Sequence, residues 1–184
     1  MKKLGIVTLL ILVTASLSFG QADIGLKMLG GKVGYIMPDG IDDAIGFGVV
    51  AELGSITPAI HLDAFIDYWG KKYDSYDYEI SFSEIVIGAT GKYKFETSGQ
   101  FQPYAGGGLA FIIAKSKGEY TGPNTEWYTG TDTESSDTEL GFHFCGGADY
   151  PFSDSMIGFA EVRYVMSDGD YFGIYAGVKF QMGN

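Results

Sequence analysis

The sequence predicts an all-β fold, an eight-stranded antiparallel up-and-down transmembrane β-barrel. After residue 20, eight segments alternate apolar with polar residues, which is the pattern of strands with two different faces. The connections between these segments are alternately short and long. A secretion signal precedes them, and a secreted chain with this pattern is typical of a bacterial outer membrane.

The first 20 residues have the parts of a cleaved signal peptide. Two lysines follow the initiating methionine, residues 4–17 are mainly apolar, and small residues end the segment. We therefore expect cleavage after Gly20, with Ala22 as a second choice, and a single domain over residues 21–184. An uncleaved membrane anchor is the alternative, although the apolar stretch is short for a bilayer span.

The first half of this domain contains four expected strands, at residues 24–36, 45–53, 59–69 and 80–95. The first loses its alternation near Gly30, which we interpret as a bulge. The second alternates glycine with apolar residues, and in the third Leu62 opposes His61 and Asp63. The fourth loses its alternation near Glu84. Most of these segments reach the roughly 9–11 residues that a tilted strand needs to cross a bilayer.

The second half contains four more expected strands, at residues 101–115, 138–150, 156–166 and 171–182. The fifth strand is too rich in glycine for its faces to be assigned. The sixth sets Phe142 and Phe144 against His143 and Cys145, and the last two alternate in the same way. Cys145 is the only cysteine, so it cannot form an internal disulfide, and we expect it to be a small buried residue.

The connections predict the orientation of the barrel. Three of them are short, at residues 54–58, 97–100 and 151–155. The others are residues 37–44, 70–79, 116–137 and 167–170, and three of these four are longer. Small bacterial barrels have short periplasmic turns and longer outer loops, so both termini are expected to face the periplasm.

Alternation alone does not show which face points outward, because a lipocalin-like soluble barrel would enclose its apolar face. Here the polar face is rich in glycine, which suits the narrow interior of eight strands. Aromatic residues also fall into two bands, as at the two interfaces of a membrane barrel. The band near the loops is Tyr68, Phe82, Phe142, Tyr164 and Phe172, and the band near the turns is Tyr93, Phe95, Phe101, Tyr150 and Phe180. We therefore expect the apolar face to contact lipid.

The polar face supplies the candidate site residues, which we expect to lie in the lumen. They are Glu52, His61, Asp63, Glu84, Lys92, Glu139, His143, Glu161, Arg163 and Lys179. An unpaired charge inside a narrow barrel would be unfavourable, so we favour a network of paired charges that fills the lumen. Arg163, the only arginine, is expected to pair with Glu161 or Glu139 through its forked guanidinium. A narrow porin-like channel for small solutes is the alternative.

A lipid-modifying outer-membrane enzyme is a less favoured alternative. Such an enzyme would need a serine, a histidine and an acid close together. His61 and His143 are the only histidines, and neither has a serine at a recognisable spacing. We therefore expect no enzymatic activity, no catalytic residue, no cofactor and no metal site.

The expected outer loops are acidic and aromatic. They hold more than half of the 23 acidic residues, namely Asp39, Asp42, Asp43, Asp74, Asp77, Glu79, Glu119, Glu126, Asp132, Glu134, Asp137, Asp168 and Asp170. One interpretation is a surface for an extracellular ligand, with aromatic contact area and carboxylates that select basic partners or divalent cations. The other is a loop set that is merely solvated. Without its two signal lysines the chain has 10 basic and 23 acidic residues, a net charge of −13, which argues against nucleic acid.

Two segments carry a resemblance to a known family. Residues 103–109 read Pro-Tyr-Ala-Gly-Gly-Gly-Leu, and the last expected strand contains Tyr175, Gly177, Phe180 and Met182. The chain resembles the OmpA/OmpX-type family of small outer-membrane barrels. The resemblance implies a monomer surrounded by outer-membrane lipid and lipopolysaccharide. It also implies that the last strand is an assembly signal, read by the barrel-assembly machinery through those four residues.

Overall fold

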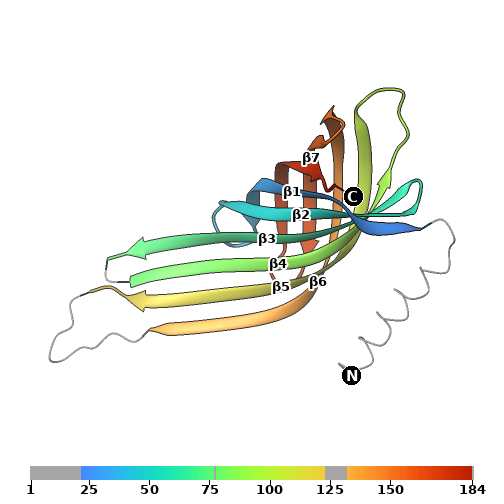
Figure 1. The fold of residues 1–184 in the computed structure, drawn as a ribbon. Coiled ribbons are helices and arrows are strands. Elements are labelled where there is room, and N and C mark those ends of the chain that lie inside the picture. Colours follow the sequence, from blue (N-terminus) through green and yellow to red (C-terminus); the bar gives the residue numbers. More distant parts are fainter. Residues whose placement is uncertain (1–21, 77, 123–131, 184) are drawn as a thin grey trace, which may run out of the picture.

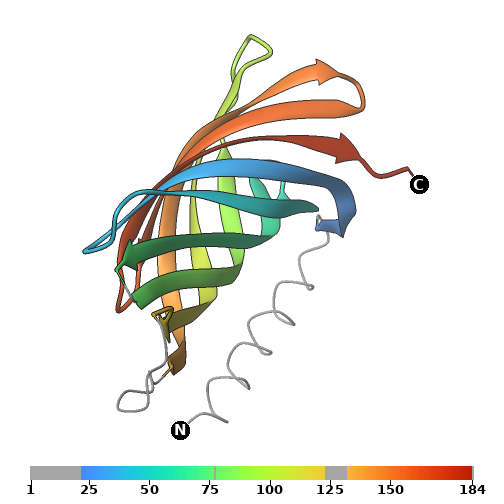
Figure 2. The ribbon, with the colours of Figure 1, turned by 90° about the vertical axis from the view of Figure 1, so that its left-hand side faces the viewer.

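Eight antiparallel strands form a closed ring in chain order, so that β1 pairs with both β2 and β8 (Figures 1 and 2). They are β1 (Asp23–Pro38), β2 (Ala44–Thr57), β3 (Ile60–Ser75), β4 (Tyr78–Lys94), β5 (Gln102–Tyr120), β6 (Thr133–Ser153), β7 (Met156–Met166) and β8 (Tyr171–Gln181). The predicted fold class is therefore confirmed.

The computed structural model describes residues 22–76, 78–122 and 132–183. The expected signal peptide, residues 1–20, lies outside the described residues. Within the described ranges, no helix is both long and apolar enough to cross a membrane.

The two faces of the strands lie as a membrane barrel requires. On β6, His143 and Cys145 point into the barrel and are buried, whereas the side chains of Phe142 and Phe144 are 55% and 60% exposed. The same alternation leaves a belt of Val, Ile, Leu, Phe and Tyr side chains on the outside of the ring. A lipocalin-like barrel would enclose these side chains. Their outward position instead suits an apolar solvent, because water-soluble surfaces rarely expose so large an apolar area.

The prediction of a bulge near Gly30 is wrong. β1 pairs with β2 in a continuous register from Met28 to Ile36, and its only irregularity lies between Ile24 and Met28. Met28 and Ile36 face the interior together with Lys32. Because these two inward side chains are apolar, the sequence pattern looks as if the strand had shifted by one residue, although its side chains still alternate between the two faces.

The fourth strand also keeps its register, because β4 pairs with β3 and β5 without a shift near Glu84. Phe82 shares the parity of Glu84 and of the fully buried Val86. Its ring packs against Tyr73, with ring centroids 6.3 Å apart. The prediction that Phe82 belongs to the outer aromatic band is therefore wrong, whereas Tyr68 is half exposed on the outside.

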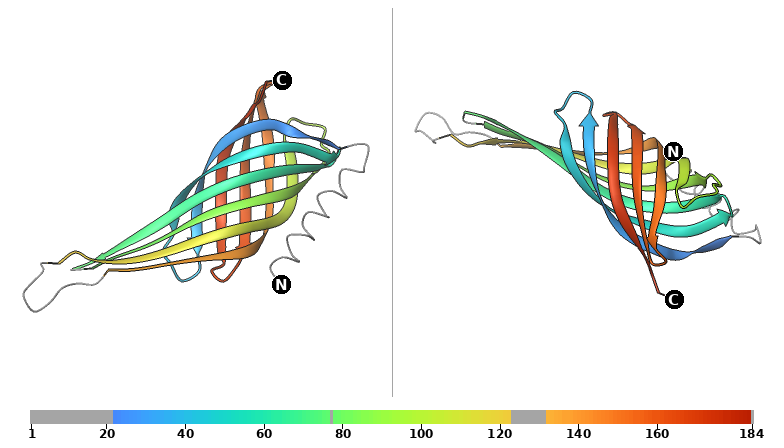
Figure 3. Two further views of the ribbon diagram at one scale, coloured as in Figure 1. Left: turned by 60° about the horizontal axis from the view of Figure 1, so that its bottom comes forward. Right: turned by 90° about the horizontal axis from the view of Figure 1, so that it is seen from above.

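Much of the two expected long loops is strand. β3 and β4 continue to Ser75 and from Tyr78, and β5 and β6 continue to Tyr120 and from Thr133. These four strands extend well beyond the ends of their neighbours as one curved sheet (Figures 1 and 3). We call residues 70–75, 78–83, 115–120 and 133–136 the projecting sheet. Its lower row consists of Gly70, Ser83, Lys115 and Ser136, which are successive register partners.

The outer face changes from apolar to charged at that row. Below it, the outward side chains include Tyr68, Ile85, Ile113 and Leu140. Above it, the same face carries Lys72 paired with Glu79, and Lys117 paired with Glu119, each at 2.7 Å. The change from apolar to charged side chains marks the outer boundary of the bilayer, so the projecting sheet stands outside it.

The connections at the opposite end differ in length from those expected, and the one between β4 and β5, residues 95–101, is longer than the expected 97–100. The other two are shorter. β2 runs on to Thr57 and β3 begins at Ile60, so only two residues of that link remain outside strands. Likewise β6 reaches Ser153 and β7 begins at Met156. Within β2, Gly54 adopts a left-handed φ of 94°, and an added Cβ would lie 2.0 Å from the Asp23 carbonyl oxygen. Only glycine fits this close approach of two strands.

Candidate functional site

The interior of the barrel is filled by a balanced set of charges, which we call the interior charge network. Its five cations are Lys32, Lys92, Lys94, Arg163 and Lys179, and its five anions are Glu52, Asp63, Asp67, Asp149 and Glu161. All ten are buried, and each has an opposite charge within 3.5 Å. Paired in this way, the charges lower one another's cost of desolvation.

Arg163 is the centre of the larger group. Its Nη2 and Nε atoms donate to Oε1 of Glu161 at 2.5 and 3.1 Å, and its Nη1 donates to Oδ2 of Asp67 at 3.2 Å. Lys32 Nζ lies 2.9 Å from the same Asp67 carboxylate. The guanidinium also lies 3.8 Å from the ring centroid of Phe65, which places a cation over an aromatic face.

Lys92 extends this group across the lumen. Its Nζ lies 2.8 Å from Oδ2 of Asp63 and 2.8 Å from Oε2 of Glu161. The hydroxyl of Tyr104 donates to the same Glu161 oxygen at 2.9 Å, and the Tyr104 ring lies 4.3 Å from Lys92 Nζ. Glu161 therefore receives bonds from side chains of β4, β5 and β7.

A second group lies closer to the short turns. Lys179 Nζ donates to Glu52 at 3.0 Å and to Asp149 at 3.4 Å. Lys94 Nζ lies 3.0 Å from Asp149 and 3.5 Å from Glu52, so two amines share two carboxylates. His61 adds a contact at the border, where its Nδ1 lies 3.2 Å from Glu52 Oε1.

An apolar cluster closes the barrel on the side of the projecting sheet. It includes Ile36, Ala44, Phe65, Trp69, Val86, Ala110, Ile112, Val165, Tyr171 and Tyr175, all buried. These side chains come from seven of the eight strands and fill the interior beyond the charges. The interior therefore contains paired charges toward the short turns and apolar side chains toward the projecting sheet.

The structure places the ten predicted lumen residues in different settings. Six belong to the interior charge network, namely Glu52, Asp63, Lys92, Glu161, Arg163 and Lys179, and His61 contacts Glu52 at its edge. The other three lie elsewhere. His143 Nε2 lies 2.9 Å from the Thr90 hydroxyl, Glu84 accepts a bond from Trp69, and Glu139 accepts one from the Asp168 backbone amide at 3.0 Å. Glu161, not Glu139, is the carboxylate that holds Arg163.

Four members of the network were not among the predicted residues, namely Lys32, Asp67, Lys94 and Asp149. Asp67 and Asp149 stand on the polar faces of β3 and β6, so their alternation alone could have indicated them. Lys32 and Lys94 lie on strands whose faces were unclear from the sequence. Their partners, Asp67 for Lys32 and Asp149 for Lys94, come from other strands and become visible only in the closed ring.

The four residues of the expected assembly signal lie on the two faces of β8 and of the residue that follows it. Tyr175 is buried inside, and Phe180 and Met182 are exposed on the outside. Gly177 faces the interior, where an added Cβ would lie 2.4 Å from the Gly31 carbonyl oxygen. The outer side of this terminal segment therefore presents apolar side chains, and the inner side fits closely against β1.

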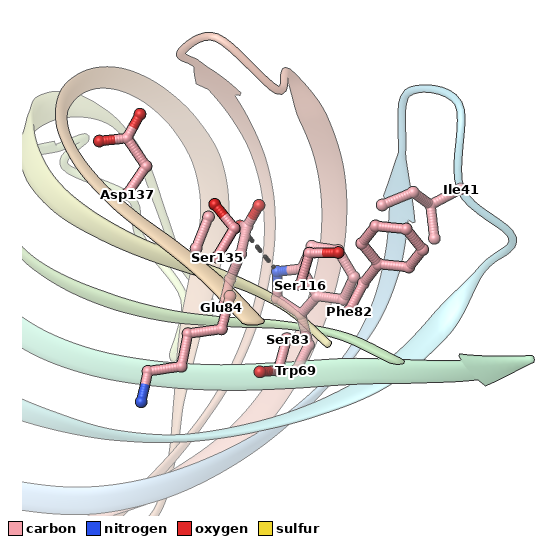
Figure 4. Close-up of a pocket in the computed structure, with 10 residues that line it drawn as sticks. Ile41, Trp69, Phe82, Ser83, Glu84, Ser116, Ser135 and Asp137 are labelled. Atoms are coloured by element: carbon pink, nitrogen blue, oxygen red, sulfur yellow. Dashed lines mark hydrogen bonds between the residues drawn. The ribbon is translucent and has the colours of Figure 1, made fainter. Parts of the chain in front are cut away.

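A cleft lies at the outer mouth of the barrel, where the projecting sheet begins (Figure 4). It has a volume of about 220 Å³, and Trp69, Phe82, Glu84 and Ile41 lie in its wall. Hydrogen bonds to β3 help to hold the turn that carries Ile41. The Asp42 backbone amide donates to the Tyr73 hydroxyl at 2.7 Å, and Lys71 Nζ donates to the Asp43 carbonyl at 3.0 Å.

Among the residues that the structure describes, no group of three His, Cys, Asp or Glu side chains is placed to hold a metal ion. Cys145 is a free, buried thiol. His143 packs edge-on against Phe65, with centroids 5.3 Å apart, inside the ring and away from the lipid-facing surface.

A closed ring of eight strands with an apolar outer belt and a filled, charged interior defines a small transmembrane barrel. The chain belongs to the outer membrane protein beta-barrel domain family, whose model matches residues 6–182. This confirms the resemblance to OmpA/OmpX-type barrels and supports a location in the outer membrane. A comparison with curated proteins gives no match.

Several solved structures are similar to this chain. Neisserial surface protein A is 17% identical, with a TM-score of 0.61, over 84% of this chain and 96% of that chain. Ail of Yersinia pestis is 11% identical, with a TM-score of 0.57, over 85% and 97%. The N-terminal barrel domain of OprF from Pseudomonas aeruginosa is 15% identical, with a TM-score of 0.52, over 86% and 99%. At these identities the likeness shows the fold.

Proposed function

We propose that this protein is a closed, non-conducting outer-membrane barrel that acts through the part standing outside the bilayer. The observation that carries the proposal is the double closure of the lumen. Five cations and five anions are paired in the interior, and an apolar cluster lies above them. A solute would have to break charge pairs and then pass between packed apolar side chains. A barrel of eight strands is too narrow to leave much space for this.

Conductance across planar bilayers tests this proposal directly. We expect the refolded full chain to insert without steady single-channel steps. Steady steps that change with Arg163→Ala or Glu139→Gln would instead support the narrow channel for small solutes. A non-enzymatic role is part of the same proposal, because His143 contacts Thr90 within the interior and is not placed to meet a lipid.

The exterior offers an acidic surface for a cell-surface interaction. The projecting sheet and its neighbouring turns carry Asp42, Asp74, Glu134 and Asp137 among other carboxylates, so a basic partner or a divalent cation suits this surface better than an anion. Ail of Yersinia pestis has been solved with the heparin analogue sucrose octasulfate. The acidic charge of the present surface argues against carrying that ligand class over to this chain.

Shortening the β5–β6 hairpin tests the surface role. Ser116 and Ser135 are register partners, so an Asn-Gly turn can join them in place of residues 117–134. In nanodiscs of zwitterionic lipid, we expect the full chain to bind an oligolysine peptide in a salt-sensitive way and the shortened chain to bind it much less. Both chains should keep their heat-dependent gel shift. Equal binding by the two chains would contradict the role of the hairpin.

The location of the protein in the cell is the second part of the proposal. We infer that residues 1–20 are removed on export and that the mature monomer lies among outer-membrane lipid and lipopolysaccharide. The apolar outer side of Phe180 and Met182 supports recognition of the last strand by the barrel-assembly machinery. Membrane fractionation, gel mobility before and after boiling, and the mass of the intact chain test these points together. A soluble periplasmic product without a heat shift would contradict them.

A further inference from the structure

The cleft at the outer mouth contains a carboxylate that differs from those inside the barrel. Glu84 lies at the base of the projecting sheet and accepts a hydrogen bond from Trp69 Nε1 at 3.1 Å (Figure 4). Among the residues that the structure describes, no lysine, arginine or histidine nitrogen lies within 4.0 Å of its oxygens. Every anion of the interior charge network, by contrast, has a cation within 3.5 Å.

The charges around Glu84 do not supply that cation. Glu139, on β6 and separated from β4 by β5, is a further carboxyl group near Glu84. Asp137 also borders the cleft. Lys115 borders it as well, but its side chain is exposed and belongs by alternation to the opposite face of β5. The base of the cleft therefore holds carboxyl groups without a neighbouring cation among the described residues, and it has room for a positively charged group.

The walls of the cleft are largely apolar. The rings of Trp69 and Phe82 and the side chain of Ile41 line it, and Figure 4 shows Trp69 beside Glu84, with Phe82 and then Ile41 on one side of it. Its volume of about 220 Å³ is below the roughly 300–1,000 Å³ of sites for drug-sized molecules. A ligand that fills it is small, with one cationic end and one apolar end.

We propose that this cleft binds a small protonated amine with an apolar body. The ammonium group lies beside Glu84, where it supplies the missing positive charge, and the body packs against Trp69 and Phe82. The apolar cluster below the cleft separates the ligand from the interior charge network, so the amine reaches the site from outside the cell and does not pass through the barrel. This ligand site is independent of the surface role of the β5–β6 hairpin, and the shortened hairpin retains the cleft residues named here.

Calorimetric titration of the full chain in phosphatidylcholine nanodiscs tests the proposal. Phenethylamine at about pH 8.5, where the amine is still protonated, is the probe, and phenethyl alcohol, which has the same body without the charge, is its control. We expect saturable binding of the amine and binding of the alcohol that is weaker by at least about tenfold. No saturable binding of the amine, or equal binding of the two compounds, would overturn the proposal without the need for any variant.

Two matched variants locate the site. Glu84→Gln keeps an acceptor for Trp69 but removes the charge, so it should weaken amine binding by about tenfold and remove the preference over the alcohol. Glu79→Gln makes the same change on the same strand, but on the opposite face of the projecting sheet, and should leave binding unchanged. The heat-dependent gel shift shows whether each variant has folded. Unchanged amine binding by a folded Glu84→Gln protein would place the amine elsewhere and refute the site.

Discussion

Arg163 and Glu161 stand two positions apart on β7, and the guanidinium of the first closes onto the carboxylate of the second inside the barrel. Two nitrogens of Arg163 donate to one oxygen of Glu161, and a third donates to Asp67 on β3. One side chain thus connects two walls of the ring.

Replacement of Arg163 should destabilise the barrel strongly. Arg163→Ala leaves Glu161 and Asp67 buried with less compensating charge, and removal of one partner from a buried ion pair costs about 3–5 kcal/mol. The free energy of unfolding, measured by urea titration of the refolded protein in detergent, checks this. The matched control is Lys72→Ala, which removes an exposed ion pair on the projecting sheet and should change stability little. Equal stability of Arg163→Ala and the parent chain would refute the network as a source of stability.

Lys94 and Lys179 should compensate for each other. Each amine contacts both Glu52 and Asp149, so the loss of one leaves the other in place. We expect Lys94→Met and Lys179→Met together to destabilise the protein beyond the sum of the single changes, by roughly 0.5–3 kcal/mol. A double-mutant cycle of unfolding free energies measures this coupling. The pair Lys117→Met and Lys179→Met, which share no contact, should be additive, and additivity in the first cycle would contradict the shared pairing.

Two glycines of neighbouring strands should respond differently to the same substitution. A Cβ at Gly108 would lie 1.8 Å from the Ala89 carbonyl oxygen, whereas the nearest atom to a Cβ at Gly146 is 3.9 Å away. We expect Gly108→Ala to destabilise the barrel by about 1–3 kcal/mol through overpacking and Gly146→Ala to be tolerated. Folding yield and urea midpoints of the two variants give the comparison. Similar behaviour of both would mean that the interior accommodates the extra methyl group.

The turn between β7 and β8 should contribute to acid sensitivity. Asp170 accepts bonds from the Tyr164 hydroxyl and the Ser167 amide, at 2.6 and 2.8 Å, and these bonds lower the pKa of its carboxyl below the ordinary 3.8. A lowered folded-state pKa stabilises the protein above the unfolded value, and that contribution is lost as the pH falls through the folded value.

Asp170→Asn should therefore reduce the stability lost between neutral pH and about pH 3, relative to the parent chain. Urea midpoints of both chains at the two pH values give the difference. Asp154→Asn, in a turn at the other end of the barrel, is the control. A parent and an Asp170→Asn protein with identical acid sensitivity would show that these hydrogen bonds do not stabilise the turn.

The sequence predicts the bilayer-spanning part of the fold well because lipid and lumen make opposite demands on alternate residues. On β6, Phe144 and Cys145 already show which face each side chain takes. Apolar–polar alternation does not predict the strands above the bilayer, because both faces of a strand meet water there. Tyr78 and Tyr120 are register partners within strands, but their segments read as loops because the apolar–polar contrast is absent there.

For the candidate site, the sequence predicts which strand face a residue occupies but not which residues it pairs with. Glu161 and Arg163 are recognisable as lumen residues from the strand that carries them. The partners are not, because Asp67 meets both Lys32 and Arg163 only when β1, β3 and β7 are bent into one ring. Glu84 and Trp69 are register partners, but the apolar walls of their cleft come from the β1–β2 turn as well.

The placement of the ion pairs has a consequence for assembly. Lys179 on β8 reaches Glu52 on β2, beyond the intervening β1, and Arg163 on β7 reaches Asp67 on β3. In a sheet whose β1 and β8 have not yet met, these residues are too far apart to neutralise one another. Charges that enter a membrane unpaired are strongly disfavoured. Closure of the ring therefore completes the pairing of these charges, so a half-inserted sheet is disfavoured relative to the closed ring. We expect these ion pairs to stabilise the closed ring over an open sheet.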